Sequence, residues 1–339
     1  MLTRRFGIGR LGRAPARMKV RAMIAAAVAA VSLAVSSQGA DAKEQTHVIG
    51  YSLPYADVPV VTAINRLIVE HAKERGYKTL LDPTQGGALQ GQQATLDSWI
   101  DQKVDAVMAY AINPPALVAI GRRAKAAGIV FTAYGAPIDG AEATVDFGVP
   151  EGARRVAAVT IAWINANDPA AEVILLADSQ NQATAARTSV PADLIPKQTK
   201  AKIVATQDAT TQQQGFEVVS TILQGHPNVS VVVGLNDDSA LGAARAFKQA
   251  GKDPSKTFII GTDGSKPAIE ELLKNDPNSF FKASAALDLK KLAAACVDAM
   301  IDLAEKGPPT TPLTVSVPPD VVTAKDVDHL KQLLANLGG

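Results

Sequence analysis

The 339-residue chain has one cysteine and four histidines, and both scarcities exclude classes of protein. A single cysteine, Cys296, cannot form an internal disulfide, so no disulfide framework supports the fold. Cys296 lies in an Ala-rich helical pattern and is interpreted as a small buried hydrophobe. The histidines lack the short spacings of metal ligands, so we predict no metal site. They are His47, His71, His226 and His329.

An excess of charge of one sign is also missing. The chain has 34 basic and 33 acidic residues, which gives a formal net charge of +1. Nucleic-acid binding needs a basic face, so we expect no nucleic-acid partner.

Catalytic motifs are absent as well. The sequence has no GxSxG elbow, phosphate loop or HExxH motif. Residues Gly7 to Gly12 match the dinucleotide fingerprint GxGxxG, but no strand pattern precedes them, so we interpret the match as chance. Triads can assemble from distant residues, so motifs alone do not exclude an enzyme. We predict a non-enzymatic protein without cofactors.

The longest apolar stretch, Ala22 to Val35, is interrupted only by Ser32 and is too short to span a membrane comfortably, because a transmembrane helix needs about 20 apolar residues. A basic stretch precedes the run, and Ala40-Asp41-Ala42 supplies small residues where a signal peptidase cleaves. We therefore predict a cleavable signal peptide over 1–42, a mature protein starting at Lys43, and a periplasmic location.

Two points about export stay open. Met18 is an alternative start that gives a signal of ordinary length, and Arg4 and Arg5 allow a twin-arginine route in place of the general one. The one cysteine, Cys296, lies far beyond the end of the apolar run, so we expect no lipid anchor.

From His47 onward, short apolar runs alternate with longer amphipathic stretches, which is typical of parallel α/β layers. In the first unit, Val48–Leu53 is predicted as a strand, and Val60, Ile64 and Leu67 then recur at helical spacing. Further predicted strands form two series, which predict an α/β fold with two doubly wound parallel-sheet lobes. The series are 78–81, 105–110 and 128–134, then 172–177, 202–207, 229–235 and 258–262.

Three further β-prone segments are predicted to be crossovers between the lobes. They are Ala141–Gly148, Phe280–Leu287 and Pro312–Val317. The predicted N-terminal lobe comprises 43–149 plus 287–316, and the C-terminal lobe comprises 150–286 plus 317–339. The three crossovers would together form a hinge.

Polar and aromatic residues follow the predicted strands at their carboxyl ends, where open α/β sheets bind ligands. The polar residues have an alternative structural role, because Asp, Asn and Thr at such positions cap helices. The tyrosines have one as well, since they could anchor the loops that carry them. Their convergence favours a ligand site. The candidates are Tyr55, Asp57, Asn113 and Tyr134 in the first series, and Thr210, Asn236 and Asp263 in the second.

Four stretches resemble the ribose- and galactose-binding type of periplasmic binding proteins. They are VIGYSLPYADVPVVTAINRLIVEHAKERGY (Val48–Tyr77), the helical and strand segment Thr95–Ile112, VVVGLNDDSALGAARAFKQAG (Val231–Gly251) and FIIGTDG (Phe258–Gly264). The likeness runs over essentially the whole mature chain. It implies a type I periplasmic binding protein fold, capture of a sugar or sugar-like solute, and a monomer that delivers the solute to an ABC permease in the inner membrane.

The resemblance also implies roles for single residues. Asn236 matches an asparagine that hydrogen-bonds a sugar hydroxyl, and Asp263 matches an aspartate that accepts from adjacent hydroxyls, which suits a vicinal diol. Arg187 lies two residues before a common arginine position. Asp288 is close to a hinge position where Ala286 replaces a polar residue. We count Arg187 and Asp288 among the candidate ligand residues.

Other positions depart from the family pattern. Val60 and Val61 stand where many sugar binders carry paired aromatics, and Gly135-Ala136 stands where an Asp-Arg pair is frequent. Ser189 stands where an arginine is common. These departures favour a polyol, a modified sugar or a less hydroxylated ligand over ribose or galactose.

Three functions fit the pattern. A transport receptor is favoured. A sensor on the same fold, feeding a chemoreceptor or membrane kinase, is second, and a periplasmic enzyme is third because a fold alone assigns no chemistry. Transcription repressors share the fold but need an N-terminal helix-turn-helix, and that position here holds the predicted signal peptide.

Overall fold

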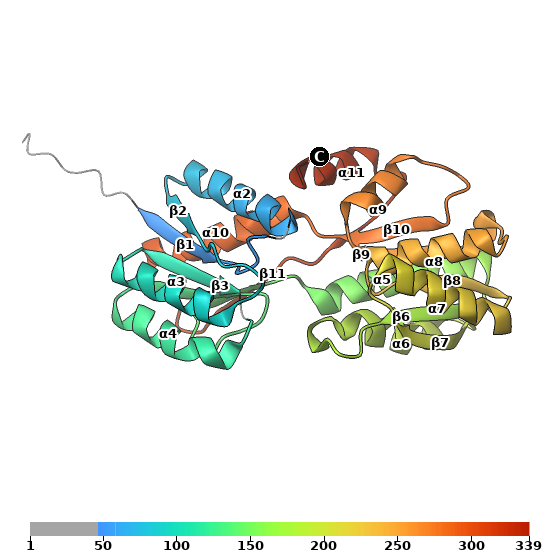
Figure 1. Ribbon diagram of the computed structural model, residues 1–339, viewed down its shortest axis with the longest axis horizontal. Coiled ribbons are helices and arrows are strands. Elements are labelled where there is room, and N and C mark those ends of the chain that lie inside the picture. Colours follow the sequence, from blue (N-terminus) through green and yellow to red (C-terminus); the bar gives the residue numbers. More distant parts are fainter. Residues whose placement is uncertain (1–46, 58, 111, 339) are drawn as a thin grey trace, which may run out of the picture. The chain divides into compact units, whose positions relative to one another are not determined.

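The computed structural model describes residues 47–57, 59–110 and 112–338 (Figure 1). The predicted signal peptide, both candidate start residues and Lys43 lie outside the described residues. Within the described ranges, no helix has the length and apolar character needed to cross a membrane.

The first lobe contains a six-stranded sheet in the order β11-β5-β4-β3-β1-β2, in which all neighbouring strands are parallel. Its strands are β1 (Val48–Ser52), β2 (Lys78–Leu81), β3 (Ala106–Tyr110), β4 (Val130–Tyr134), β5 (Ala143–Asp146) and β11 (Leu313–Ser316). Its helices are α2 (Pro59–Glu74), α3 (Leu89–Asp101), α4 (Pro114–Ala126) and α10 (Leu289–Lys306).

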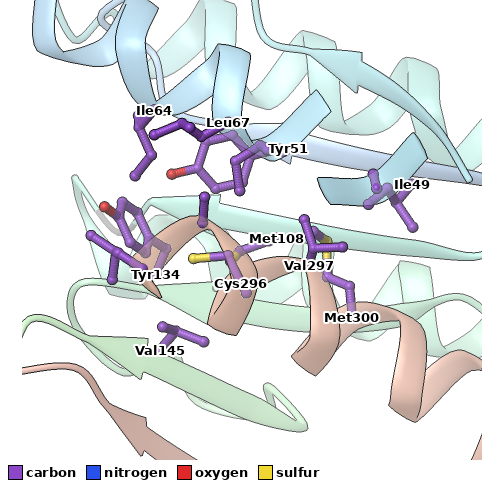
Figure 2. Close-up of a cluster of buried hydrophobic side chains, with 14 of the residues drawn as sticks. Ile49, Tyr51, Ile64, Leu67, Met108, Tyr134, Val145, Cys296, Val297 and Met300 are labelled. Atoms are coloured by element: carbon purple, nitrogen blue, oxygen red, sulfur yellow. The ribbon is translucent and has the colours of Figure 1, made fainter. Parts of the chain in front are cut away.

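The helices of the first lobe cover both faces of its sheet, because side chains of a strand point alternately to either face. In β3, Met108 packs with α2 and α10, whereas its neighbours Val107 and Ala109 pack with α3 and α4. Figure 2 shows the first of these cores, where Tyr51 and Cys296 are fully buried. The predicted burial of Cys296 is confirmed, and burial raises the pKa of its thiol.

The second lobe contains the sheet β12-β10-β9-β8-β6-β7, in which β12 runs antiparallel to β10 and the other neighbours are parallel. Its strands are β6 (Glu172–Ala177), β7 (Lys202–Asp208), β8 (Val229–Val233), β9 (Phe258–Asp263), β10 (Phe281–Ala286) and β12 (Asp320–Thr323). Its helices are α5 (Val149–Asn167), α6 (Ala186–Gln198), α7 (Gln212–Gly225), α8 (Asp237–Gln249), α9 (Lys266–Leu273) and α11 (Val327–Asn336). The predicted α/β fold with two parallel-sheet lobes is confirmed.

The three segments expected to be crossovers form strands themselves. They contain β5, β10 and β11, and the chain passes from the elements of one sheet to those of the other directly after each strand. The actual passages are therefore shorter than expected, at 147–148, 287–288 and 317–319. Strand β12, which follows the third passage, was not predicted.

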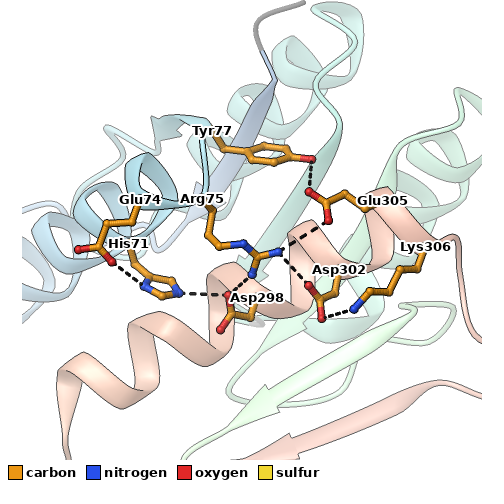
Figure 3. Close-up of polar contacts among 8 residues, drawn as sticks. All are labelled: His71, Glu74, Arg75, Tyr77, Asp298, Asp302, Glu305 and Lys306. Atoms are coloured by element: carbon orange, nitrogen blue, oxygen red, sulfur yellow. Dashed lines mark hydrogen bonds and ion pairs between the residues drawn. The ribbon is translucent and has the colours of Figure 1, made fainter.

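A polar network fixes α10 to α2 in the first lobe (Figure 3). Arg75, just after α2, pairs with Asp298 and lies 3.0 Å from the Asp302 carboxylate, while His71 Nε2 lies 3.1 Å from Asp298. Asp298 and Asp302 are one helical turn apart, so both face the same neighbour. Partly exposed ion pairs of this kind each stabilise the folded protein by at most about 1 kcal/mol. The network nonetheless ties α10 to a helix more than 220 residues earlier in the chain.

Candidate functional site

A cavity of about 250 Å³ lies where strands β1, β3, β4 and β5 end in the first lobe. Four aromatic side chains line it, and seven aliphatic side chains complete the wall, among them Val60 and Ile64 from α2. None of the described residues lining the cavity carries a charge, an amide or an aliphatic hydroxyl. The polar side-chain atoms of the wall are three phenol hydroxyls. The aromatic residues are Tyr55, Tyr110, Tyr134 and Phe147.

The aromatic rings of the cavity pack on one another. Tyr110 and Tyr134 are register partners on β3 and β4, with ring centroids 5.8 Å apart. Phe147 meets Tyr134 edge to face at 5.0 Å, and Tyr55 meets Tyr110 edge to face at 6.1 Å. Burial raises the pKa of Tyr110 and, further, of Tyr134. Both hydroxyls therefore stay protonated near neutral pH and can donate hydrogen bonds.

The structure brings the predicted Tyr55 and Tyr134 into this one cavity, together with Tyr110 and Phe147, which the sequence reasoning missed. Tyr110 ends its strand as Tyr134 does, and that position was the available signal. Phe147 directly follows β5, which had been assigned to a crossover.

The loop that carries Tyr55 is fastened to a second loop. Asp57 Oδ1 accepts a hydrogen bond from the Gly86 amide at 3.1 Å, and the Gly87 amide donates to the Pro54 carbonyl at 2.8 Å. Asp57 is exposed and does not line the cavity. Gly87 has a φ of +69°, and a Cβ there would lie 2.6 Å from the Tyr55 hydroxyl. Asp57 thus supports the loop, and Gly87 leaves room for the Tyr55 ring.

In the second lobe, the predicted Arg187 and Asp263 form an ion pair. The guanidinium Nη2 lies 2.7 Å from Asp263 Oδ1, and Nη1 donates to the Leu235 carbonyl at 3.2 Å. The Arg187 side chain is 16% exposed and that of Asp263 is 41% exposed, so the carboxylate remains the more accessible partner. Asp263 has a φ of +113°, a strained conformation for a residue with a side chain.

Near the ion pair lies Asp237, a buried carboxyl that directly follows the candidate residue Asn236. Asp237 Oδ2 accepts from the Ser265 amide at 2.6 Å and Oδ1 accepts from Ser284 Oγ at 2.7 Å. The Gly264 amide donates in turn to Ser284 Oγ at 3.2 Å. The two residues that follow Asp263 are therefore held by Asp237, directly or through Ser284.

The environment of Asp237 is unfavourable for a negative charge. Burial, followed by the nearby charge of Asp263, raises its pKa from 3.8 to about 8, although two hydrogen bonds act in the opposite direction. Burial also raises the pKa of Asp263, and the Arg187 guanidinium opposes that rise.

Asn236 and Thr210 link the ends of two strands to the helices that follow. Asn236 Oδ1 accepts from the Ser239 amide at 2.8 Å, which caps α8, and its Nδ2 donates to the Thr210 carbonyl at 2.8 Å. Thr210 Oγ1 bonds Gln214 Oε1 at 3.1 Å. Asn236 makes no other side-chain hydrogen bond within the described residues, so one amide N–H is available to a ligand.

The other two candidates cap helices and do not line the cavity. Asn113 is exposed and accepts from the Ala116 amide at 3.4 Å, at the start of α4. Asp288 is buried and accepts from the amides of Lys290 and Lys291 at 3.0 and 3.1 Å, at the start of α10. Ligand roles for the candidate residues stay predictions. The described residues include no group of three or more His, Cys, Asp or Glu able to hold a metal ion.

Comparison with known proteins gives a match over most of the chain. Residues 49–308 match the family model described as a periplasmic binding protein domain. The ribose import binding protein of Bacillus subtilis (strain 168) is 28% identical over 247 residues, covering 70% of this chain and 75% of the relative. The D-allose-binding periplasmic protein of Escherichia coli (strain K12) is 31% identical over 134 residues, or 39% of this chain and 41% of the relative.

Solved structures share the fold at low sequence identity. An ABC transporter periplasmic solute binding protein from Actinobacillus succinogenes 130z with bound D-allose has a TM-score of 0.69 and 19% identity, covering 84% of this chain and 100% of its own. A periplasmic ribose ABC transporter structure from Conexibacter woesei DSM 14684 has a TM-score of 0.71 and 17% identity, and the match covers 86% of this chain and 96% of that structure's chain. At these identities the likeness establishes the architecture alone.

Proposed function

We propose that this chain, which belongs to the family of periplasmic binding protein domains, captures a small sugar or sugar-like solute in the periplasm and delivers it to an ABC import permease. The family match over residues 49–308 confirms the resemblance found in the sequence. Relatives named as import binding proteins for ribose and allose support sugar capture. Export through a cleaved signal over 1–42 belongs to the same proposal.

One observation carries the proposal: each lobe presents a different kind of half-site at its strand ends. The first lobe offers the aromatic cavity around Tyr134, and the second offers the Arg187–Asp263 pair beside Asn236. Aromatic rings suit an apolar part of a sugar-like solute, and a carboxylate with a fork of N–H donors suits its hydroxyls. A solute that contacts both half-sites makes more contacts when the two lobes come together, so it favours the closed arrangement.

We further propose that the two lobes, with the boundaries given above, close on the solute by bending at the three passages. The ligand drives closure only through its greater affinity for the closed state. The permease would then recognise the closed arrangement, and the receptor would act as a monomer.

The chain is proposed to be a receptor and not an enzyme. Asp263 is paired with Arg187, and Asp237 is buried and already occupied by two donors, so neither is placed as a free base or nucleophile. A receptor returns its solute unchanged, whereas a hydrolase or isomerase does not.

The test begins with ligand released from purified protein by denaturation and identified by mass spectrometry. The identified solute is then titrated into ligand-free protein by calorimetry and recovered for analysis. We expect saturable binding, recovery of unaltered solute, and stabilisation of about 2.7 kcal/mol at 100 times the dissociation constant. Conversion of the solute, or release of no sugar-like molecule together with no binding of any sugar, contradicts the proposal.

A further inference from the structure

We infer that the captured solute carries an apolar six-membered ring in addition to its hydroxyl groups, as an aryl glycoside does. This inference rests on the proposed function and specifies the chemical class of its substrate. It assigns the apolar ring to the cavity of the first lobe and the hydroxylated part to Arg187, Asn236 and Asp263 in the second lobe.

The walls of the cavity are the first argument. They comprise eleven side chains, and the three phenol hydroxyls are their only polar side-chain atoms among the described residues. A hydroxyl buried against such a wall without a partner loses about tenfold in affinity. A free hexose or pentose carries hydroxyls around its ring, so several would be buried unpaired. An apolar ring has no hydroxyl to leave unpaired, so it loses no hydrogen bond when it enters the cavity.

The size of the cavity is the second argument. Its volume is about 250 Å³. An apolar cavity of about 150 Å³ is already large enough to hold benzene. One six-membered ring therefore fits, with room for the bond that joins it to the rest of the solute. The edge-to-face arrangement of Tyr134 and Phe147 shows that the wall already packs rings in this way.

The exposure of Val60 is the third argument. Val60 lies at the start of α2, lines the cavity and is 46% exposed. Val69 lies on the same helix, is 39% exposed and does not line the cavity. Of these two exposed valines, Val60 alone would be covered by a ring in the cavity. The pair therefore provides a variant and a matched control.

The contrast between the lobes is the fourth argument. The ion pair of the candidate site, Arg187 with Asp263, lies in the second lobe, whereas none of the described side chains lining the cavity of the first lobe carries a charge. A solute that is apolar at one end and hydroxylated at the other matches both half-sites. A uniformly hydroxylated ring matches only the second.

The experiment compares two matched pairs of probes by calorimetry: methyl and phenyl β-D-galactopyranoside, and methyl and phenyl β-D-glucopyranoside. D-Ribose and D-allose represent free sugars, and phenol represents the ring alone. We expect at least one phenyl glycoside to bind tenfold or more tightly than its methyl counterpart. Val60→Ser should lower the affinity for the phenyl glycoside about tenfold and leave the affinity for the methyl glycoside unchanged. Val69→Ser should change neither.

The outcomes separate the inference from the proposed function. If free sugars or methyl glycosides bind as tightly as the phenyl glycosides, the inference is overturned and the sugar receptor stands. If phenol binds and no sugar or glycoside does, the apolar cavity is supported and the sugar-binding proposal fails. Binding of no probe contradicts both. An equal loss of phenyl-glycoside affinity in Val60→Ser and Val69→Ser overturns the placement of the ring in the cavity.

Discussion

The Arg187 guanidinium lies 2.7 Å from the Asp263 carboxylate, and this ion pair joins the first turn of α6 to the last residue of β9. Asp263 reaches this position in a conformation that favours glycine, with a φ of +113°. Retaining an aspartate in such a conformation costs free energy, of order 1 to 3 kcal/mol. The carboxylate is therefore expected to have a function that offsets the strain.

The strain at Asp263 can be separated from its charge with two substitutions. Asp263→Ala and Asp263→Gly both remove the carboxylate, so each should weaken binding of the identified solute by at least tenfold. Only glycine relieves the backbone strain, so Asp263→Gly should be more stable than Asp263→Ala by about 1 kcal/mol. Urea denaturation and calorimetry measure the two effects. Equal stability of the two variants would mean that the backbone is unstrained.

The buried carboxyl of Asp237 predicts an unusual dependence of stability on pH. Its pKa is about 8, compared with 3.8 for the free side chain. Between these values the folded protein holds a proton that the unfolded chain has released, so this group's contribution to the free energy of unfolding falls as pH rises from about 4 to 8. Asp237→Asn abolishes the titration. The stability advantage of the wild type over Asp237→Asn should shrink by about 1 kcal/mol or more between pH 5 and pH 8.

Asp238→Asn serves as the control for this measurement. Asp238 is the next residue, is exposed, and accepts a hydrogen bond from Gln212 at 3.0 Å. This variant retains Asp237, so its stability should still fall as the pH rises from 5 to 8. A constant difference between wild type and Asp237→Asn across the range would show that Asp237 remains charged in the folded protein.

Adjacent glycines allow the position of Tyr55 to be tested. Gly86 and Gly87 have φ values of +61° and +69°, so alanine strains both, at about 1 kcal/mol. A Cβ at Gly87 would collide with the Tyr55 ring, whereas a Cβ at Gly86 meets nothing within 4 Å. Gly87→Ala should therefore weaken solute binding about tenfold, and Gly86→Ala should leave it unchanged. Equal affinities would show that Tyr55 does not contact the solute.

A substitution of Asp288 tests whether its side chain caps a helix or binds the solute. Its carboxylate accepts from two amides at the start of α10, so Asp288→Ala should lower the free energy of unfolding by about 1 kcal/mol. Solute affinity should stay within twofold of wild type because the carboxylate is already occupied by the two amides of the cap and lies 3.6 Å from the Lys291 ammonium. A loss of affinity with unchanged stability would restore the ligand role assigned from the sequence.

The fold was predictable because strands buried on both faces appear as continuous apolar runs. The predicted strands at 172–177 and 258–262 fall on β6 and β9, and all but one residue of each of these strands is buried. Strand β12 was missed because it is four residues long and follows Pro318-Pro319, which indicate a break in regular structure. Its pairing with β10 depends on a contact between distant segments.

The candidate site was predictable only in part. Asn and Asp after a strand serve equally as caps and as ligand groups, so local sequence could not separate Asp288 from Asp263. The position of Asp237 depends on Ser284, 47 residues away, and no local pattern encodes that contact. The ring cluster depends on the register of β3 against β4, which likewise exists only in the folded sheet.

The final prediction concerns closure of the lobes. Gly148 lies at the first passage and has a φ of +56°, and a Cβ there would lie 2.6 Å from the Cα of Pro318 in the third passage. Gly148→Ala should push these two passages apart and hinder bending. We expect weaker binding of the identified solute, although residue 148 does not line the cavity. Small-angle scattering should show a smaller decrease in the radius of gyration on solute binding than in the wild type.

Gly140→Ala separates this effect from simple strain. Gly140 precedes β5, has a φ of +87°, and a Cβ there meets nothing within 4 Å. Both variants should lose about 1 kcal/mol of stability because each places alanine at positive φ, and Gly148→Ala should lose more because of its contact with Pro318. Only Gly148→Ala should lose compaction and affinity, since only it creates a contact between two passages. If Gly148→Ala closes as fully as Gly140→Ala, bending does not occur at these passages, and the hinge must lie elsewhere in the chain.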